Sequence, residues 1–417
     1  MLRTLFPKSH PRYEQSRCAS ELEAFADWLE GAGYMCRNVR GHIRRLHRAL
    51  GRHRREVSEC RHSERTVQQM FAAGLTSRRA EVGAHATERL YRRFIETRGR
   101  LITTERRTRH ASELVRYRGY LTDVRGFAAP TIDQHLTTVA DFLRHALGAK
   151  GRLPALTSQH AEAYVASRAS TVRRESLQHI VAHLRAFLRY CVLHDLLRRR
   201  PGPIDTPRTY RGERPPRALP WPLIQQLLAS IDRAEKSGWR DYAILHLMAH
   251  YGLRPSEIVT LRLDSIDWAA STLQVEQRKT QSKLLLPLMP RTMTILRRYL
   301  VAGRPYSEHP QLFLRARDPA GPLKHTAICD VFSKRASRIG LPLERYSSYS
   351  LRHGFAVHLL DRGVGIKAIG DVLGHRSFES TQVYLRLETE KLRAIALPVP
   401  QSPRSSSRRP SLPRRRK

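Results

Sequence analysis

Three segments between residues 250 and 385 carry residue types that could act on a phosphodiester. The first contains Arg254, the second contains Arg352, and the third contains His375, which Tyr384 follows nine residues later. A phosphodiester is an anion with poor leaving groups, so its oxygens must be neutralised by fixed cations and hydrogen-bond donors. A tyrosine hydroxyl can then attack the phosphorus and keep the bond energy in a phosphotyrosine. These residues are therefore candidates for a phosphoryl-transfer site.

The charge balance indicates a polyanionic partner. The 417 residues include 75 Lys and Arg against 37 Asp and Glu, which gives a formal net charge of +38. The positive side chains repel one another unless a polyanion neutralises them, and nucleic acid is the commonest such partner. The alternative is an arginine-rich composition with solvated charges, although the excess is much larger than solubility requires.

Other features argue against export, membrane insertion and a metal site. No stretch approaches the roughly 20 apolar residues of a membrane span, and the N-terminus lacks the apolar core of a signal peptide. We therefore expect a cytoplasmic protein. The five cysteines are widely spaced and odd in number, which fits neither a disulfide framework nor a zinc site. Cys36, Cys60 and His62 could be considered as ligands, but their spacing matches no common zinc module, so we expect no metal and no cofactor.

All three segments resemble active-site boxes of the tyrosine recombinase, or phage integrase, family. HYGLRPSEIVTLRLDSID resembles the first box, in which Arg254 matches the catalytic arginine and Glu257 matches its supporting carboxylate. YSLRHGFAVHLL resembles the second box, and Arg352 matches the second catalytic arginine. The resemblance implies that the two arginines clamp the scissile phosphate.

The second box also contains a departure from the family pattern, and the third box holds the nucleophile. Most relatives have histidine where this chain has Tyr349, whose hydroxyl can still bond a phosphate oxygen but is a poor proton shuttle at neutral pH. His353 matches a residue that packs behind the site. LGHRSFESTQVYL resembles the third box, which implies that His375 contacts the phosphate and that Tyr384 attacks it.

The family's lysine is expected in a β-hairpin. TLQVEQR and KLLLPLM, joined by a short polar segment, favour two antiparallel strands. Counting back from Pro287 and Leu288, which resemble the end of the family's hairpin, places the lysine at Lys279. Lys283 is the alternative, because the alignment depends on the hairpin register. The resemblance implies that this lysine protonates the departing 5′ hydroxyl.

The resemblance implies a site-specific recombinase that cleaves and rejoins double-stranded DNA through a 3′-phosphotyrosine, without metal or ATP. Integration or excision of a mobile element in a bacterial cytoplasm is the expected role, and a homo- or hetero-tetramer is the expected assembly. One alternative is a DNA-binding accessory protein with weak or no catalysis, which Tyr349 motivates. A type IB topoisomerase-like relaxase and a general basic chromatin protein are further alternatives.

The expected fold is mainly α-helical with a small β-hairpin, and the chain is long enough for several domains. We expect a helical core-binding, SAM-like domain at 110–200 and an α+β catalytic domain at 219–397. A basic linker at 201–218 joins them, and the tail at 398–417 is expected to be disordered. Residues 1–105 match no family motif, and an accessory helical extension that binds DNA or a partner is expected there.

Helical periodicity places several elements and suggests a repeat. Segments near 223–231 and 241–251 and much of the chain from 326 to about 387 are expected to be helical. Gly33-Tyr34 and Gly126-Phe127 precede similar apolar patterns, which suggests an internally duplicated helical unit. The patterns consist of Val39, Ile43, Leu46 and Leu50 in one segment and of Ile132, Leu136, Val139 and Leu143 in the other.

Overall fold

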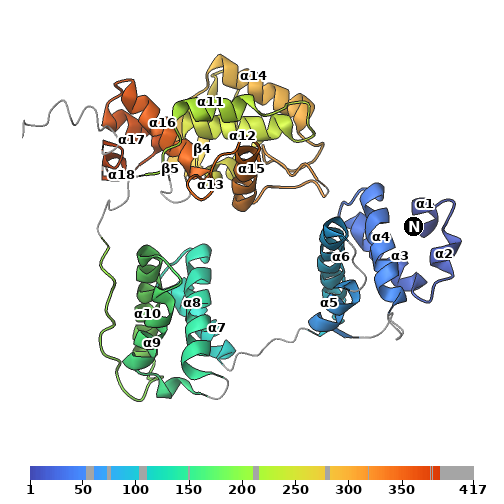
Figure 1. The fold of residues 1–417 in the computed structure, drawn as a ribbon, viewed down its shortest axis with the longest axis horizontal. Coiled ribbons are helices and arrows are strands. Elements are labelled where there is room, and N and C mark those ends of the chain that lie inside the picture. Colours follow the sequence, from blue (N-terminus) through green and yellow to red (C-terminus); the bar gives the residue numbers. More distant parts are fainter. Residues whose placement is uncertain are drawn as a thin grey trace, which may run out of the picture. The chain divides into compact units, whose positions relative to one another are not determined.

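The computed structural model describes residues 1–52, 61–72, 77–102, 110–148, 151–209, 216–277, 282–317, 319–375, 377 and 379–385. Helices dominate these residues, and the strands are short, as the sequence predicted. The chain divides into two compact units, Met1–Glu213 and Arg214–Lys417, and the first unit contains two separate hydrophobic cores. Figure 1 shows the elements along the chain. In the described residues, no helix is long and apolar enough to cross a membrane.

The first core belongs to a group of helices that we call the first helical group, α3–α6. Its apolar side chains recur at helical spacing and meet inside, where Phe25, Ile43 and Tyr91 have no exposed surface. Two short helices, α1 (Leu2–Leu5) and α2 (Pro11–Glu14), and a parallel strand pair, β1 (His62–Ser63) with β2 (Leu101–Ile102), accompany it. The helices of the group are α3 (Ala19–Gly31), α4 (Cys36–Gly51), α5 (Glu64–Ala72) and α6 (Arg78–Thr97).

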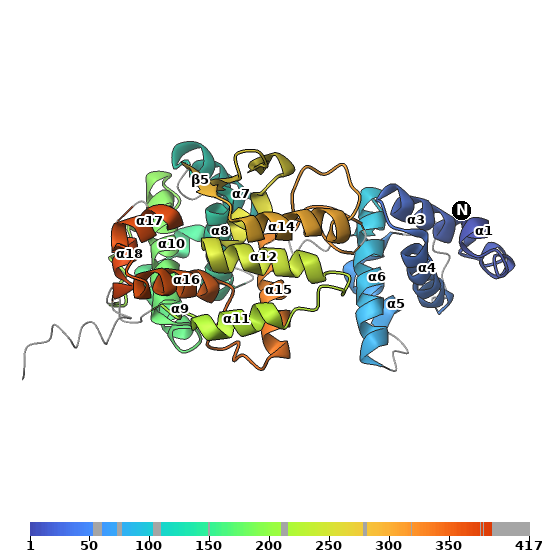
Figure 2. The same ribbon diagram turned by 90° about the horizontal axis from the view of Figure 1, so that it is seen from above.

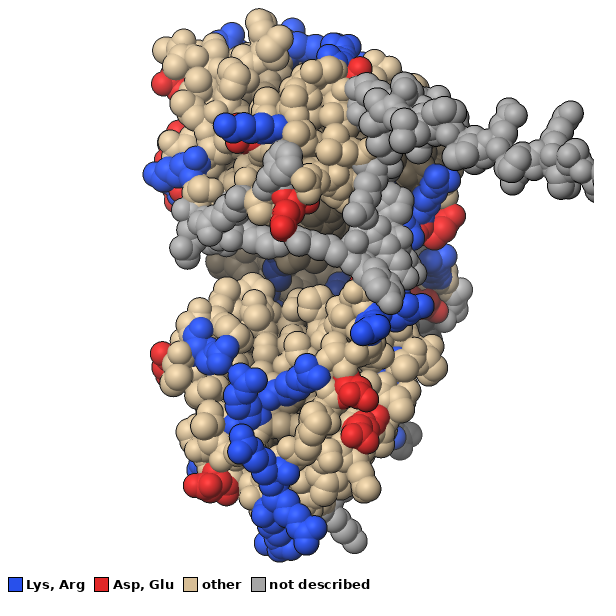
Figure 3. All heavy atoms as spheres, turned by 90° about the vertical axis from the view of Figure 1, so that its left-hand side faces the viewer, with Lys and Arg blue, Asp and Glu red and all other residues tan. Residues whose placement is uncertain are grey.

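The second core belongs to the second helical group, α7–α10. Its third helix begins at a capping box in which Thr157 and His160 bond reciprocally. Lys and Arg side chains form a band on one face of this group, in the lower half of Figure 3. The helices are α7 (Ala111–Gly119), which continues as the π-helical turn η1 (Tyr120–Val124), α8 (Ala129–Leu147), α9 (Ser158–Ala169) and α10 (Arg174–Leu193), with the 3-10 turn η2 (Leu153–Ala155) after α8.

The second unit packs helices around a central one, α12 (Gly238–Tyr251). Residues 242–249 of α12 are buried on all sides, as expected for a helix that is covered all round. Figure 2 shows α11 and α14 beside it. The other helices of the unit are α11 (Trp221–Ala229), α13 (Pro255–Thr260), α14 (Pro290–Arg298), α15 (His325–Arg338), α16 (Tyr349–Asp361), α17 (Ile366–Leu373) and α18 (Glu379–Gln382), with the short turns η3 (Leu263–Ser265) and η4 (Tyr299–Gly303).

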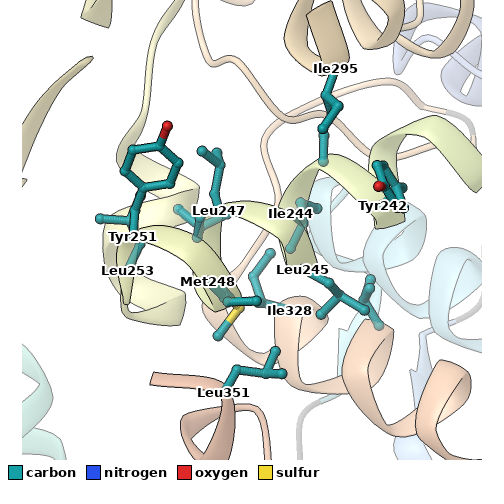
Figure 4. Close-up of a cluster of buried hydrophobic side chains, with 14 of the residues drawn as sticks. Tyr242, Ile244, Leu245, Leu247, Met248, Tyr251, Leu253, Ile295, Ile328 and Leu351 are labelled. Carbon is teal, nitrogen blue, oxygen red and sulfur yellow. The ribbon is translucent and has the colours of Figure 1, made fainter. Parts of the chain in front are cut away.

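The core around α12 holds the elements that carry the candidate residues. In this cluster Leu245 and Met248 lie on the side of Ile328 of α15 and Leu351 of α16, and Ile295 of α14 lies on the opposite side of α12, near Ile244 (Figure 4). Leu351 immediately precedes Arg352 in the chain. The packing of α16 against α12 therefore fixes the position of the second candidate arginine.

A small antiparallel sheet follows α13. Its strands β4 (Thr272–Gln277) and β5 (Ser282–Pro287) form the predicted hairpin, with Thr272 opposite Pro287 and Gln277 opposite Ser282. A third strand, β3 (Ile266–Asp267), pairs with β4 and was not expected. The sequence also gave no indication of α14, which begins at Pro290 directly after the hairpin. Lys279 and residues 398–417 lie outside the described residues.

Candidate active site

Arg254 is held at the start of α13 by Glu257. Arg254 is the N-cap residue, with extended backbone, and Pro255 starts the helix. One carboxylate oxygen of Glu257 accepts a hydrogen bond from the Arg254 backbone N–H at 2.8 Å, and the other accepts one from Nη1 at 2.6 Å. The contact thus joins an N-cap to the third residue of the helix, rather than two residues on one helical face. Glu257 is buried, and the Arg254 side chain keeps 19% of its surface exposed.

Arg352 lies deep in the site and bonds two backbone carbonyls. Its Nη1 donates to the carbonyl oxygen of Gly252 at 2.6 Å, and its Nη2 donates to that of Leu373 at 2.7 Å. Burial lowers its pKa to about 10, and the nearby charge of Arg254 adds to the effect. Arg352 therefore remains a cation at neutral pH, and it links the end of α12 to the end of α17.

One carbonyl acceptor belongs to a glycine with left-handed backbone, Gly252, and the other, that of Leu373, immediately precedes a second such glycine, Gly374. Gly252 ends α12 at φ 63°, and Gly374 ends α17 at φ 64°. A Cβ at Gly252 would lie 2.5 Å from Cδ2 of Leu373, and a Cβ at Gly374 would lie 2.2 Å from the side-chain amide of Gln277. The two helix ends and the end of β4 can approach one another this closely because these positions are glycines.

His375 directly follows Gly374 and bonds Thr381. Its Nδ1 lies 2.8 Å from the Thr381 hydroxyl oxygen, and Thr381 is buried. Burial lowers the pKa of His375 to about 4, and the charges of Arg352 and Arg254 act in the same direction. His375 is therefore neutral at pH 7, and its ring lies nearly parallel to that of Tyr384, with ring centres 6.4 Å apart.

Tyr384 is buried and contacts His353. Only 2% of the tyrosine is exposed, and its hydroxyl oxygen lies 3.0 Å from Nδ1 of His353. Burial raises the pKa of Tyr384, while the positive charges of Arg352 and Arg254 act to lower it. Burial lowers the pKa of His353 to about 4. His353 was expected to pack behind the site, but its ring nitrogen faces the candidate nucleophile.

Comparisons with known proteins identify the family to which the chain belongs. The model of the phage integrase family matches residues 222–391. A putative integrase/recombinase, y4rA of Sinorhizobium fredii, is 30% identical over 287 residues, which cover 68% of this chain and 70% of that protein. The chain belongs to the phage integrase family of tyrosine recombinases. A second relative, the tyrosine recombinase XerC of Alcanivorax borkumensis, is 31% identical over 53% of this chain and 72% of its own length. This protein is a tyrosine-type site-specific recombinase.

Solved structures of tyrosine recombinases share the fold. The XerH site-specific recombinase, in a post-cleavage complex with its palindromic difH substrate, aligns with a TM-score of 0.54 over 91% of this chain and 93% of that chain, at 12% identity. A lambda integrase dimer bound to a COC′ core site aligns with a TM-score of 0.51 over 66% of this chain and 94% of that chain, at 18% identity.

Tyr349, the recombinase's departure from the family pattern, lies at the first position of α16. It is 47% exposed, whereas Arg352, one turn later, is buried. The two residues are three positions apart on α16, so they lie on the same side of the helix. Tyr349 is thus an exposed hydroxyl at the edge of the cluster.

The hairpin reaches the same cluster through Gln277, which the sequence did not single out. Gln277 is the last residue of β4, is buried, and its side-chain amide donates to the Leu373 carbonyl at 3.4 Å. Arg352 donates to this same oxygen. Lys279, two residues after Gln277, falls outside the described residues. The alternative, Lys283, is exposed on β5 opposite Glu276.

Proposed function

We propose that this recombinase cleaves and rejoins DNA through a covalent 3′-phosphotyrosine at Tyr384. The surroundings of the Tyr384 hydroxyl carry the proposal. A neutral histidine, His353, lies 3.0 Å away, and the charges of Arg352 and Arg254 act to lower the tyrosine pKa. A nucleophilic hydroxyl needs a proton acceptor and nearby positive charge, and both are present.

The proposed step transfers the phosphoryl group without net loss of bond energy. The Tyr384 oxygen attacks phosphorus while its proton passes to Nδ1 of His353, and the bond from phosphorus to the 5′ oxygen breaks. The departing 5′ oxygen takes a proton from Lys279, or from Lys283 if that is the family's lysine. A 5′ hydroxyl from the partner strand then attacks the phosphotyrosine, so rejoining requires no ATP.

Arg254, Arg352 and His375 would bind the non-bridging oxygens of the phosphate. The carboxylate of Glu257 and the carbonyls of Gly252 and Leu373 hold the two guanidinium groups before DNA binds. The Thr381 hydroxyl can donate to Nδ1 of His375, which leaves Nε2 to carry the proton and donate to phosphate. Two preorganised cations and a donor provide the charge stabilisation that a metal ion would otherwise supply.

The remaining chain would bring DNA to this site. We propose residues 110–200 as the core-binding domain, 201–218 as a basic linker, 219–397 as the catalytic domain and 398–417 as a basic tail. The basic band on the second helical group supports DNA binding there (Figure 3). We further propose a tetrameric synaptic complex in a bacterial cytoplasm and a role in moving a mobile element, as the likeness to integrases suggests.

A second candidate function is a DNA-binding accessory protein with weak or no catalysis. The exposed Tyr349, in place of the usual histidine, favours it. The contact between His353 and a buried Tyr384 favours catalysis instead, because a binding module has no need of a desolvated nucleophile beside a proton acceptor.

Trapping on a nicked suicide substrate tests the proposal. The DNA site is first located by footprinting, and wild type and Tyr384→Phe are then incubated with the nicked duplex in EDTA without ATP. An adduct that survives denaturation and is absent only in the Phe variant is expected. Footprinting without an adduct from wild type would contradict the mechanism and favour the accessory protein. An adduct that requires added Mg²⁺ or ATP would contradict the independence from metal and ATP.

A further inference from the structure

Three helices of the first helical group, α3, α4 and α6, have counterparts in the second group, which are α7, α8 and α10. The fourth helix of the first group, α6, and the fourth helix of the second group, α10, both contain 20 residues. The first two helices of each group are joined through a glycine with positive φ, Gly33 at 80° and Gly126 at 61°. The second helix of each group then follows an N-cap residue with the same backbone conformation, Met35 (φ −66°, ψ 145°) in one group and Ala128 (φ −67°, ψ 145°) in the other.

The register of the match can be followed through the chain. Val39, Ile43 and Leu46 of α4 correspond to residues 93 positions later in α8. Phe25 and Leu29 of α3 correspond to residues 92 positions later. The offset changes at η1, where a π-helical turn accommodates one extra residue. For α6 and α10 the offset is 96, so the second change of register falls between α4 and α6.

The aromatic cores of the two groups agree pair by pair. Five ring contacts in the first group have a counterpart at the corresponding positions of the second, which a chance likeness of amphipathic helices would not produce. The matched pairs, with distances between ring centres, are Phe25–Tyr91 (5.7 Å) and Tyr117–Phe187 (5.1 Å), Phe25–Phe94 (5.3 Å) and Tyr117–Tyr190 (5.0 Å), Trp28–Phe94 (5.9 Å) and Tyr120–Tyr190 (5.1 Å), Phe25–Trp28 (6.0 Å) and Tyr117–Tyr120 (6.4 Å), and Tyr91–Phe94 (6.0 Å) and Phe187–Tyr190 (6.4 Å).

A polar contact agrees as well. His42 of α4 bonds the hydroxyl of Thr87 of α6, with 2.9 Å between Nδ1 and Oγ1. The corresponding residues of the second group, His135 and His183, place their rings 4.1 Å apart. The residue types have changed at one of the two positions, but the same two positions meet between the same two helices.

The surfaces of the two groups differ, and the difference is in charge. Helix α4 carries five arginines and no acidic residue, whereas its counterpart α8 carries two aspartates and one arginine. Arg37, Arg44 and Arg48 are exposed and lie seven and four residues apart, so they share the face opposite the buried Ile43. We call these three residues the α4 arginine stripe. Among the described residues, none of the three forms an ion pair with an acidic side chain.

We propose that residues 2–102 are a second copy of the core-binding fold. This copy binds duplex DNA, and the α4 arginine stripe contacts the DNA phosphates. The inference rests on the proposed DNA binding of the second helical group. A copy of a DNA-binding fold that carries a row of exposed arginines and no acidic residue on this helix is suited to a backbone contact without sequence readout. The second copy therefore lengthens the DNA held by each protomer.

The salt dependence of DNA binding by the full chain tests this inference. The stripe variant is Arg37→Gln, Arg44→Gln and Arg48→Gln together. The matched control is Lys8→Gln, Arg12→Gln and Arg65→Gln, which removes the same charge from exposed positions outside α4. Each lost phosphate contact should reduce the slope of log Kobs against log[salt] by about 0.9, so the stripe variant should lose up to about 2.7 and the control much less.

Two further measurements separate the outcomes. The corresponding Arg→Lys triple keeps the charges and should restore the slope, and hydroxyl-radical footprints should shorten only in the Gln stripe variant. Equal slopes and footprints for stripe and control variants would overturn the inference, and lost recombination with equal slopes would indicate a protein partner instead. Adduct formation by wild type reports separately on the Tyr384 mechanism, so either proposal can fail alone.

Discussion

Nδ1 of His353 lies 3.0 Å from the phenolic oxygen of Tyr384, although the two residues are 31 positions apart in the chain. Burial keeps the histidine neutral at pH 7, because its pKa is lowered to about 4. A neutral imidazole can accept the proton that the tyrosine must lose, so the contact fits general-base assistance of the attack.

Replacing His353 should slow cleavage without preventing DNA binding. His353→Phe keeps a ring but removes the acceptor, and we expect cleavage of the suicide substrate to slow by roughly 10²–10⁴-fold. His353→Asn places an amide near the position of Nδ1 and should be slowed less. The rate of the Phe variant should also rise more steeply with pH, because the tyrosine must then ionise unaided. Equal rates and pH profiles for wild type and the Phe variant would show that His353 only packs.

Glu257→Ala should disable Arg254 by freeing its guanidinium and its backbone N–H. The carboxylate is buried and holds both groups, so we expect cleavage to fall by about 10²-fold and thermal stability to decrease. Asp264→Ala is the matched control, because Asp264 pairs with Arg262 at an exposed site where an ion pair contributes little. If both variants cleave at the same rate, Glu257 does not position Arg254.

Gly374→Ala should be more damaging than Gly340→Ala. Both glycines have positive φ, 64° and 70°, so each alanine costs about 1–2 kcal/mol of backbone strain. Only at Gly374 would the new Cβ meet a neighbour, the amide of Gln277, while nothing lies within 4 Å at Gly340. Chemical denaturation should therefore show a larger loss in the free energy of unfolding for Gly374→Ala. The cleavage rate should fall only in that variant, because the adjacent Leu373 carbonyl holds Arg352. Equal losses would argue against close packing at Gly374.

Acidification should destabilise the recombinase, partly through His246. Burial lowers the pKa of His246 to about 3, so the folded state holds the neutral form while the unfolded chain takes up a proton below about pH 6.5. The contribution of neutral His246 to the free energy of unfolding is complete above that pH. It is lost as the pH falls towards 3, by up to about 1.4 kcal/mol per pH unit. His246→Gln places a side-chain amide near the position of Nε2, where it can bond the Thr292 hydroxyl. The melting temperature of this variant should depend less on pH. An unchanged pH dependence would exclude His246 as a contributor.

Residues with a local sequence pattern could be predicted, and contacts between distant segments could not. The hairpin followed from alternation and a polar turn, and α12 followed from the helical periodicity of residues 241–251. Strand β3 has only two residues, which is too short for a pattern, and Pro287 and Pro290 obscured the apolar face of α14.

The candidate site shows the same division. Its arginines, His375 and Tyr384 stand in motifs that could be read along the chain. The carbonyl acceptors of Arg352 are 100 and 21 residues away, and backbone carbonyls carry no residue signature. The approach of His353 to Tyr384 depends in the same way on how α16 and the segment after α18 pack together.

Identification of the residue linked to DNA shows directly whether Tyr384 is the nucleophile. Trapped adduct is digested with nuclease and protease, and the peptide that carries a 3′-linked nucleotide is sequenced by mass spectrometry. We expect a phosphotyrosine linkage at Tyr384. A linkage at another residue, above all at the exposed Tyr349 one turn before Arg352, would contradict this mechanism.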